Sequence, residues 1–106
     1  ARIKDATERF GDKFLSRILT IREKEIYFER GKNGITFLAG RFAAKESISK
    51  SLKTGIGKLA FTDIEVLPDS KGAPFVYINS QKREDIEISI SHSRDYAIAV
   101  SIIRQV

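Results

Sequence analysis

The order of apolar and polar positions divides the chain into a helical first half and a strand-forming second half. The strongest helical pattern covers residues 35–53. At about 100° per residue, Leu38, Phe42 and Leu52 fall on one face of this helix, with Ile35 and Ile48 at its edges. The opposite side carries only small side chains, which predicts that another backbone segment passes close by: Gly40, Ala43, Ala44, Ser47 and Ser51.

Polar and charged residues interrupt the apolar face of this helix. Arg41, Lys45, Glu46 and Ser49 fall within the same arc as the apolar side chains. Since an unpaired buried charge is costly, Lys45 and Glu46 need a partner, which could be each other, a metal ion or a charged ligand. An ion pair at the edge of the core explains the pattern equally well, so the pattern alone leaves both interpretations open.

Three shorter helices are expected before the long one. Residues 1–10 and 12–19 have amphipathic patterns that Gly11 separates, and Thr20 followed by Glu23 has the spacing of a capping box that starts a helix ending near residue 30. Residues 31–34 form the connecting loop. This region is basic, and Arg2, Lys13 and Arg17 could share one surface.

The second half has the patterns of strands. A glycine-rich loop at residues 54–57 ends the long helix; a glycine C-cap explains it better than a phosphate-binding loop, which normally lies at a helix start. Strands are predicted at residues 60–67, 74–79, 86–91 and 96–103, while the polar residues 79–85 fit neither helix nor loop clearly. Short connections and alternation predict an α+β domain, an antiparallel sheet covered on one face by helices.

Composition limits the chemistry that one domain of 106 residues can perform. The chain has no cysteine and a single histidine, which excludes disulfides, thiolate sites and multi-histidine zinc sites. That histidine, His92, lies where a strand ends, a position from which a side chain can contact a phosphate; a surface residue without a function is the simpler interpretation. No apolar run approaches the roughly 20 residues of a membrane span and no signal peptide is visible, so we expect a cytoplasmic protein.

The net charge of +5 favours an anionic partner such as nucleic acid, a phosphorylated cofactor or an acidic protein. Lysine and arginine are dispersed without forming a block, so charge alone does not choose among these partners.

Five segments in order resemble one known family. They are residues 37–47 (FLAGRFAAKES), 54–57 (TGIG), 63–66 (DIEV), 72–74 (GAP) and 88–93 (ISISHS). Together they resemble the bacterial holo-[acyl-carrier-protein] synthases, the small group of 4′-phosphopantetheinyl transferases. The similarity extends from residue 2 to about residue 103, so the whole chain is expected to form one domain of this type.

The resemblance implies an enzyme of fatty acid biosynthesis that uses coenzyme A and magnesium. It would transfer the 4′-phosphopantetheine arm to a serine of apo acyl carrier protein and release adenosine 3′,5′-bisphosphate. Members of this group are usually homotrimers with sites between neighbouring subunits.

The resemblance also implies roles for individual residues. Glu46 matches a metal-ligating glutamate, and Lys45 matches a lysine near the transferred phosphate. The cofactor site would further include Arg41, Ser49, Gly55, Gly72, Pro74, His92 and Ser93. Arg2, Lys13 and Arg17 match the basic helical region that faces the acidic carrier protein. We assign no residue as the general base.

Family members carry a strand with a metal-binding aspartate before the first helix of this sequence. The chain begins at Ala1, after that position, so we expect its first dozen or so residues to be missing from the sequence. Two alternatives follow: a non-catalytic relative that binds the carrier protein, and, from charge alone, a basic nucleic-acid-binding module. For the transferase we expect neither a nucleic-acid nor a membrane partner.

Overall fold

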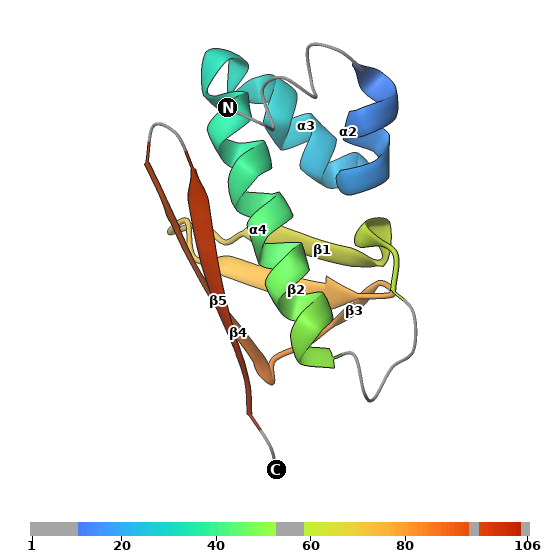
Figure 1. The fold of residues 1–106 in the computed structure, drawn as a ribbon, viewed down its shortest axis with the longest axis vertical. Coiled ribbons are helices and arrows are strands. Elements are labelled where there is room, and N and C mark those ends of the chain that lie inside the picture. The colour runs from blue at the N-terminus through green and yellow to red at the C-terminus, as the bar shows by residue number, and fades with distance from the viewer. Residues whose placement is uncertain (1–10, 53–58, 94–95, 105–106) are drawn as a thin grey trace.

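The structure of the chain is a computed structural model that describes residues 11–52, 59–93 and 96–104. The helix predicted at residues 1–10 and the glycine-rich loop at residues 54–57 lie outside the described residues. Within the described ranges, three α-helices precede five strands, an arrangement that Figure 1 shows and that confirms the predicted α+β class. Among the described residues, no helix combines the length and apolar character that crossing a bilayer requires.

The two short helices form where the sequence predicts them. Helix α2 spans Asp12–Ile18 and helix α3 spans Ile21–Glu29. The capping box at the start of α3 is present, since Glu23 N donates to Thr20 Oγ1 at 3.3 Å and Thr20 N donates to Glu23 Oε1 at 2.9 Å. A short 3-10 turn, Gly31–Asn33, then reverses the chain into α4.

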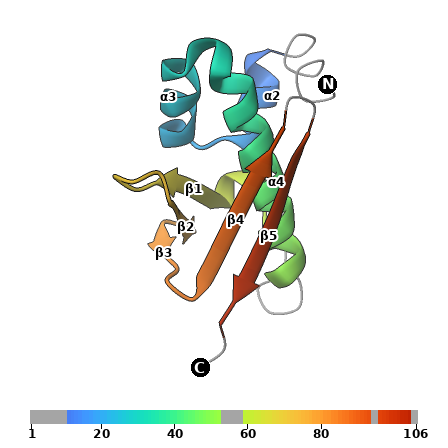
Figure 2. The same cartoon turned by 90° about the vertical axis from the view of Figure 1, so that its left-hand side faces the viewer.

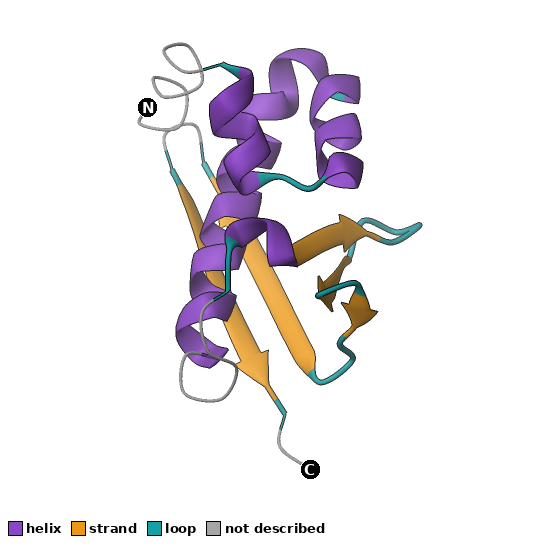
Figure 3. Cartoon of the chain, turned by 90° about the vertical axis from the view of Figure 1, so that its right-hand side faces the viewer, coloured by secondary structure: helices purple, strands orange, loops and turns teal. Residues whose placement is uncertain are grey.

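Helix α4, Gly34–Leu52, agrees with the predicted range to within one residue at each end. It runs past α2 and α3 at one end of the molecule and along the strands at the other (Figure 3). Its apolar residues therefore contribute to two core clusters. In one cluster, Phe37 and Leu38 pack against the apolar side chains of α2. In the other, Ala44 and Ile48 pack against those of the strands.

The strands form two antiparallel sheets where one was predicted. Strands β1 (Ile64–Pro68), β2 (Pro74–Ile78) and β3 (Gln81–Lys82) form the first, and β4 (Ile86–His92) pairs with β5 (Ala97–Ile103) in the second. The segment predicted as strand 60–67 begins instead with a 3-10 turn, Phe61–Asp63, because the Asp63 carboxylate accepts from Ala60 N at 2.9 Å and closes the backbone. The unassigned segment 79–85 contains β3.

The small side chains of α4 face the β4–β5 hairpin, which Figure 2 shows beside this helix. A Cβ atom at Gly40 would lie 3.1 Å from Ile90 Cγ2, and Ala44 is fully buried. Ser47 Oγ and Ser51 Oγ lie 2.8 Å and 2.9 Å from Ser101 Oγ on β5. The close backbone approach that the sequence predicts is thus provided by the β4–β5 hairpin.

A buried ion pair joins the helices to each other. Lys45 Nζ donates to Glu23 Oε1 at 2.5 Å and to the carbonyl oxygen of Ile18 at 2.6 Å, and both charged side chains are 0% exposed. Burial lowers the pKa of Lys45 below its usual value because the interior disfavours the ammonium, while the Glu23 carboxylate opposes that shift. The charged partner of Lys45 in the structure is therefore Glu23 on α3, and not the neighbouring Glu46.

Replacing Lys45 tests how far the fold depends on this pair. Lys45→Met leaves the Glu23 carboxylate buried without its countercharge, so we expect the free energy of unfolding to fall by about 3–5 kcal/mol. Lys50→Met is the control, because Lys50 lies on the same helix and is exposed. Chemical denaturation of both variants measures the difference, and equal midpoints would show that the pair contributes nothing.

Candidate functional site

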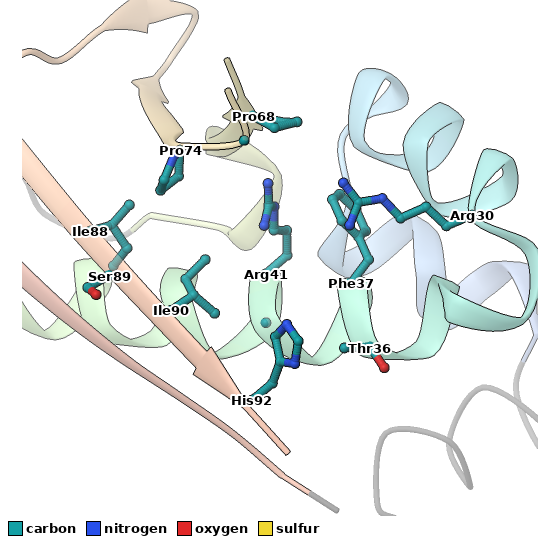
Figure 4. A pocket seen from close by; sticks show the side chains of 12 residues that line it. Arg30, Thr36, Phe37, Arg41, Pro68, Pro74, Ile88, Ser89, Ile90 and His92 are labelled. Atoms are coloured by element: carbon teal, nitrogen blue, oxygen red, sulfur yellow. The ribbon is translucent and has the colours of Figure 1, made fainter. Parts of the chain in front are cut away.

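A cavity of about 320 Å³ lies between the first half of α4, the β1–β2 turn and the end of β4. Figure 4 shows the side chains that converge on it. We call it the arginine cavity, because two arginines face it across a phenylalanine ring. Its lining is Arg30, Thr36, Phe37, Gly40, Arg41, Pro68, Gly72, Pro74, Ile88, Ser89, Ile90 and His92.

Arg41 is the buried cation of the cavity. Its Nε donates to the carbonyl oxygen of Val66 at 2.9 Å, and its guanidinium carbon lies 4.4 Å from the centre of the Phe37 ring. Burial lowers the pKa of Arg41 to about 10; the Glu23 carboxylate opposes this shift and the Arg30 cation adds to it. The side chain is still cationic at neutral pH, and since Nε is occupied, its two Nη groups are those that can reach a ligand.

Arg30 places a second guanidinium on the same ring. Its carbon lies 4.9 Å from the centre of Phe37, a geometry in which the ring face attracts a cation. The sequence interpretation missed Arg30, Thr36 and Phe37 as site residues. The signal was present, because a connection of only four residues between α3 and α4 brings the end of one helix against the start of the next.

His92, which the resemblance assigns to the cofactor site, ends β4 and lines the arginine cavity. The alternation of β4 explains this, since His92 has the same parity as Ile88 and Ile90, which pack toward α4. Ser93 follows it and lines an adjoining hollow with Arg30, Asn33, Thr36 and His92. The imidazole of His92 therefore lines the cavity that holds Arg30 and Arg41, and the hydroxyl of Ser93 lines the adjoining hollow beside Arg30.

The β1–β2 turn forms the opposite wall. Gly72 has a φ of +90°, which side chains rarely permit, and its N–H donates to the carbonyl oxygen of Asp69 at 3.0 Å. The Asp69 carboxylate accepts from Ala73 N at 2.8 Å and holds the turn in shape. Both predicted turn residues, Gly72 and Pro74, line the cavity. The structure thus brings Arg41, Gly72, Pro74 and His92 together.

Glu46 lies apart from this group. It is exposed, whereas Arg41 is buried, and their spacing of five positions along the chain corresponds to about 140° of rotation around the helix. Lys50 follows Glu46 by four residues and is also exposed, so the two form a charged strip on the outer side of α4. Lys45, predicted to lie near the transferred phosphate, is fully buried in the structure and donates to Glu23 and to the carbonyl oxygen of Ile18.

The remaining predicted residues fall in three places. Ser49 Oγ is buried on α4 without a hydrogen-bond partner among the described residues, and it does not line the arginine cavity. Lys13 and Arg17 are exposed four residues apart on α2, so they share one surface as expected. Gly55 and Arg2 lie outside the described residues.

The donors around Glu46 decide how a magnesium ion could bind. Within residues 11–52, 59–93 and 96–104, no three aspartate, glutamate or histidine side chains group closely enough to hold a metal ion. Magnesium, however, commonly binds one or two carboxylates together with substrate phosphates and water. The exposed Glu46 carboxylate fits that pattern as one ligand of a site that a phosphate completes.

The sequence and the fold are both similar to characterised proteins. A family model described as the 4′-phosphopantetheinyl transferase superfamily matches residues 1–101. A holo-[acyl-carrier-protein] synthase from Geobacillus sp. (strain WCH70) is 51% identical over 96 residues, which cover 89% of this chain and 80% of the relative.

Two solved structures give the same result. The holo-[acyl-carrier-protein] synthase of Neisseria meningitidis has a TM-score of 0.83 at 28% identity, covering 98% of this chain and 90% of that one. The Helicobacter pylori enzyme, solved in complex with coenzyme A, has a TM-score of 0.79 at 36% identity, covering 97% and 91%. The chain therefore belongs to the 4′-phosphopantetheinyl transferase superfamily, among the holo-[acyl-carrier-protein] synthases, and is a transferase.

Proposed function

We propose that this chain transfers 4′-phosphopantetheine from coenzyme A to a serine hydroxyl of apo acyl carrier protein. The serine oxygen attacks the phosphorus that carries the pantetheine arm, the pyrophosphate P–O bond breaks, and adenosine 3′,5′-bisphosphate leaves. The observation that carries this proposal is the arginine cavity, whose Arg30, Arg41 and His92 suit a phosphorylated ligand, in a chain similar to a coenzyme A-bound relative. Since such transfer supplies fatty acid synthesis, a cytoplasmic location is part of the proposal.

The cavity would bind the nucleotide end of coenzyme A. Guanidinium groups recognise phosphate through charge-assisted hydrogen bonds, and Arg41 is fixed at Nε so that its Nη groups are already oriented. Phe37 and Pro74 offer apolar surface to a base or ribose. Gly72, His92 and Ser93 complete the binding surface of this half of the site.

Glu46 and Lys50 would act at the pyrophosphate. The Glu46 carboxylate can hold magnesium. The bound ion would neutralise the negative charge that develops on the pyrophosphate. We assign to Lys50 the role that the sequence suggested for Lys45, because Lys50 is exposed one turn from Glu46 and Lys45 is paired with Glu23. The exposed Lys13 and Arg17, together with Arg2, would guide the acidic carrier protein to the site.

The complete site would need more than one copy of the chain, which fits the homotrimer expected of this family. The arginine cavity and the Glu46–Lys50 strip lie on different sides of α4, so a neighbouring subunit could supply the missing half. Strand β5 offers a surface for such contacts, because its outer face carries Ile98, Val100 and Ile102 at 59%, 56% and 57% exposure. An exposed apolar row of this kind is typical of subunit interfaces.

The transfer can be measured by the intact mass of apo acyl carrier protein. Incubation with the chain, coenzyme A and magnesium should add one phosphopantetheine group, and a chelator should prevent it. Glu46→Ala should abolish the gain, since the metal ligand is lost, while Glu25→Ala, an exposed helical glutamate on α3, should leave it intact. Full transfer by Glu46→Ala would refute the assigned role of Glu46.

A charged residue on β5 tests the assembly. Val100→Lys should convert a trimer into monomers and reduce transfer by at least tenfold, because burying an unpaired ammonium in an interface is costly. Light scattering coupled to gel filtration reports the mass of the assembly. Ile21→Lys is the control, since it adds the same charge at a position 78% exposed on α3. Trimers of Val100→Lys would place the interface elsewhere.

A further inference from the structure

We propose that Glu23 is a positioning residue for Arg41, acting through the backbone of Val66, and that nucleotide affinity therefore depends on it. The inference rests on the proposed function, in which Arg41 binds the phosphorylated end of coenzyme A. Glu23 lines neither the arginine cavity nor the adjoining hollow, and its effect on a ligand would have to pass through other groups.

The side chains of Glu23 and Arg41 are linked by the backbone of Val66, whose N–H bonds one of them and whose carbonyl oxygen bonds the other. Glu23 Oε2 accepts from Val66 N at 2.7 Å, and Arg41 Nε donates to Val66 O at 2.9 Å. Both bonds are buried. Val66 lies on β1, which pairs with β2 along its other edge, so its N–H and C=O point toward the helices and need side-chain partners there. Glu23 and Arg41 are those partners.

Glu23 is itself held from two further directions. Its Oε1 accepts from Thr20 N at 2.9 Å and from Lys45 Nζ at 2.5 Å, and the side chain is fully buried. Lys45 lies one helical turn after Arg41 on α4. One carboxylate oxygen thus holds α4, which carries Arg41, through Lys45. The other holds β1, whose Val66 carbonyl accepts from Arg41 Nε. Movement of Glu23 would change both ends of the Arg41 side chain.

The chemistry of a carboxylate is needed for this arrangement. All three groups that contact Glu23 are donors, and only a carboxylate offers acceptors at both positions. In Glu23→Gln, one of these positions carries an NH₂ group. If the amide oxygen keeps Lys45 and Thr20 N, the NH₂ faces the N–H of Val66, and the two donors repel each other. Val66 and the Arg41 guanidinium would then shift.

The test is a double-mutant cycle on nucleotide binding. Calorimetry with adenosine 3′,5′-bisphosphate gives the Kd of the wild-type chain, Glu23→Gln, Arg41→Ala and the double variant. We expect Glu23→Gln to weaken binding about tenfold. In the Arg41→Ala background the same change should have no further effect, because the group that it positions is gone; a general loss of structure would weaken binding in both backgrounds.

Glu65→Gln is the matched control. Glu65 is the preceding residue on β1 and also joins this strand to the start of α3, since its carboxylate accepts from Thr20 Oγ1 and Arg22. The hydrogen bond of Val66 N goes to Glu23 and not to this carboxylate. Its replacement should leave the Kd unchanged. If thermal unfolding shows that the Glu23→Gln variant is not folded, Glu23→Asp replaces it in the cycle. Aspartate keeps the negative charge beside Lys45, but its shorter side chain does not reach Val66 N.

The outcomes separate the two proposals. No binding to the wild-type chain would overturn the proposed function and this inference with it. Binding by the wild type together with an unchanged Kd for Glu23→Gln would overturn only the inference. A tenfold loss that persists in the Arg41→Ala background would overturn it as well.

Discussion

The fold depends on one buried carboxylate and its three donors. Glu23 caps its own helix, neutralises Lys45 from α4 and accepts the free N–H of Val66 on β1. Removing two charges from water costs several kcal/mol per ion, and only a set of well-formed hydrogen bonds offsets that cost. Because these bonds come from three elements, the carboxylate fixes their relative positions at the junction between the two apolar clusters.

This junction separates the two chemical faces of α4. Arg41 and Lys45 point inward, where Glu23 and Val66 hold them, while Glu46 and Lys50 stay in solvent. The helix thus presents a fixed guanidinium on one side and a carboxylate with an ammonium on the other. A single chain does not bring these groups together. An enzyme that moves the phosphopantetheine arm of a large nucleotide cofactor onto a protein can use this division if neighbouring subunits combine their halves, and the apolar outer face of β5 suits such contacts.

Much of the candidate site could be predicted because its residues lie in local motifs. The turn containing Gly72 and Pro74, the strand end at His92 and the helix carrying Arg41 all follow from patterns that span a few residues, and the structure gathers them around one cavity. Arg30 was missed because it contributes through packing between consecutive helices. The resemblance assigned Lys45 to the phosphate, and no local pattern could show that Glu23 on another helix pairs with it. The second sheet was missed because alternation defines strands but not which strands pair.

The sequence by itself determined the helices of residues 12–52, four of the five described strands, the capping box and the family, since each depends on periodicity or on motifs read along the chain. Only the tertiary structure decided which charges meet. Glu23 and Lys45 are 22 residues apart, and Glu23 and Val66 are 43 apart. Patterns that span a few residues cannot predict contacts between residues so far apart in the sequence. The capping box explained Glu23 completely at the level of its own helix, and the acceptor capacity that remained on its carboxylate became visible only when α4 and β1 packed against it.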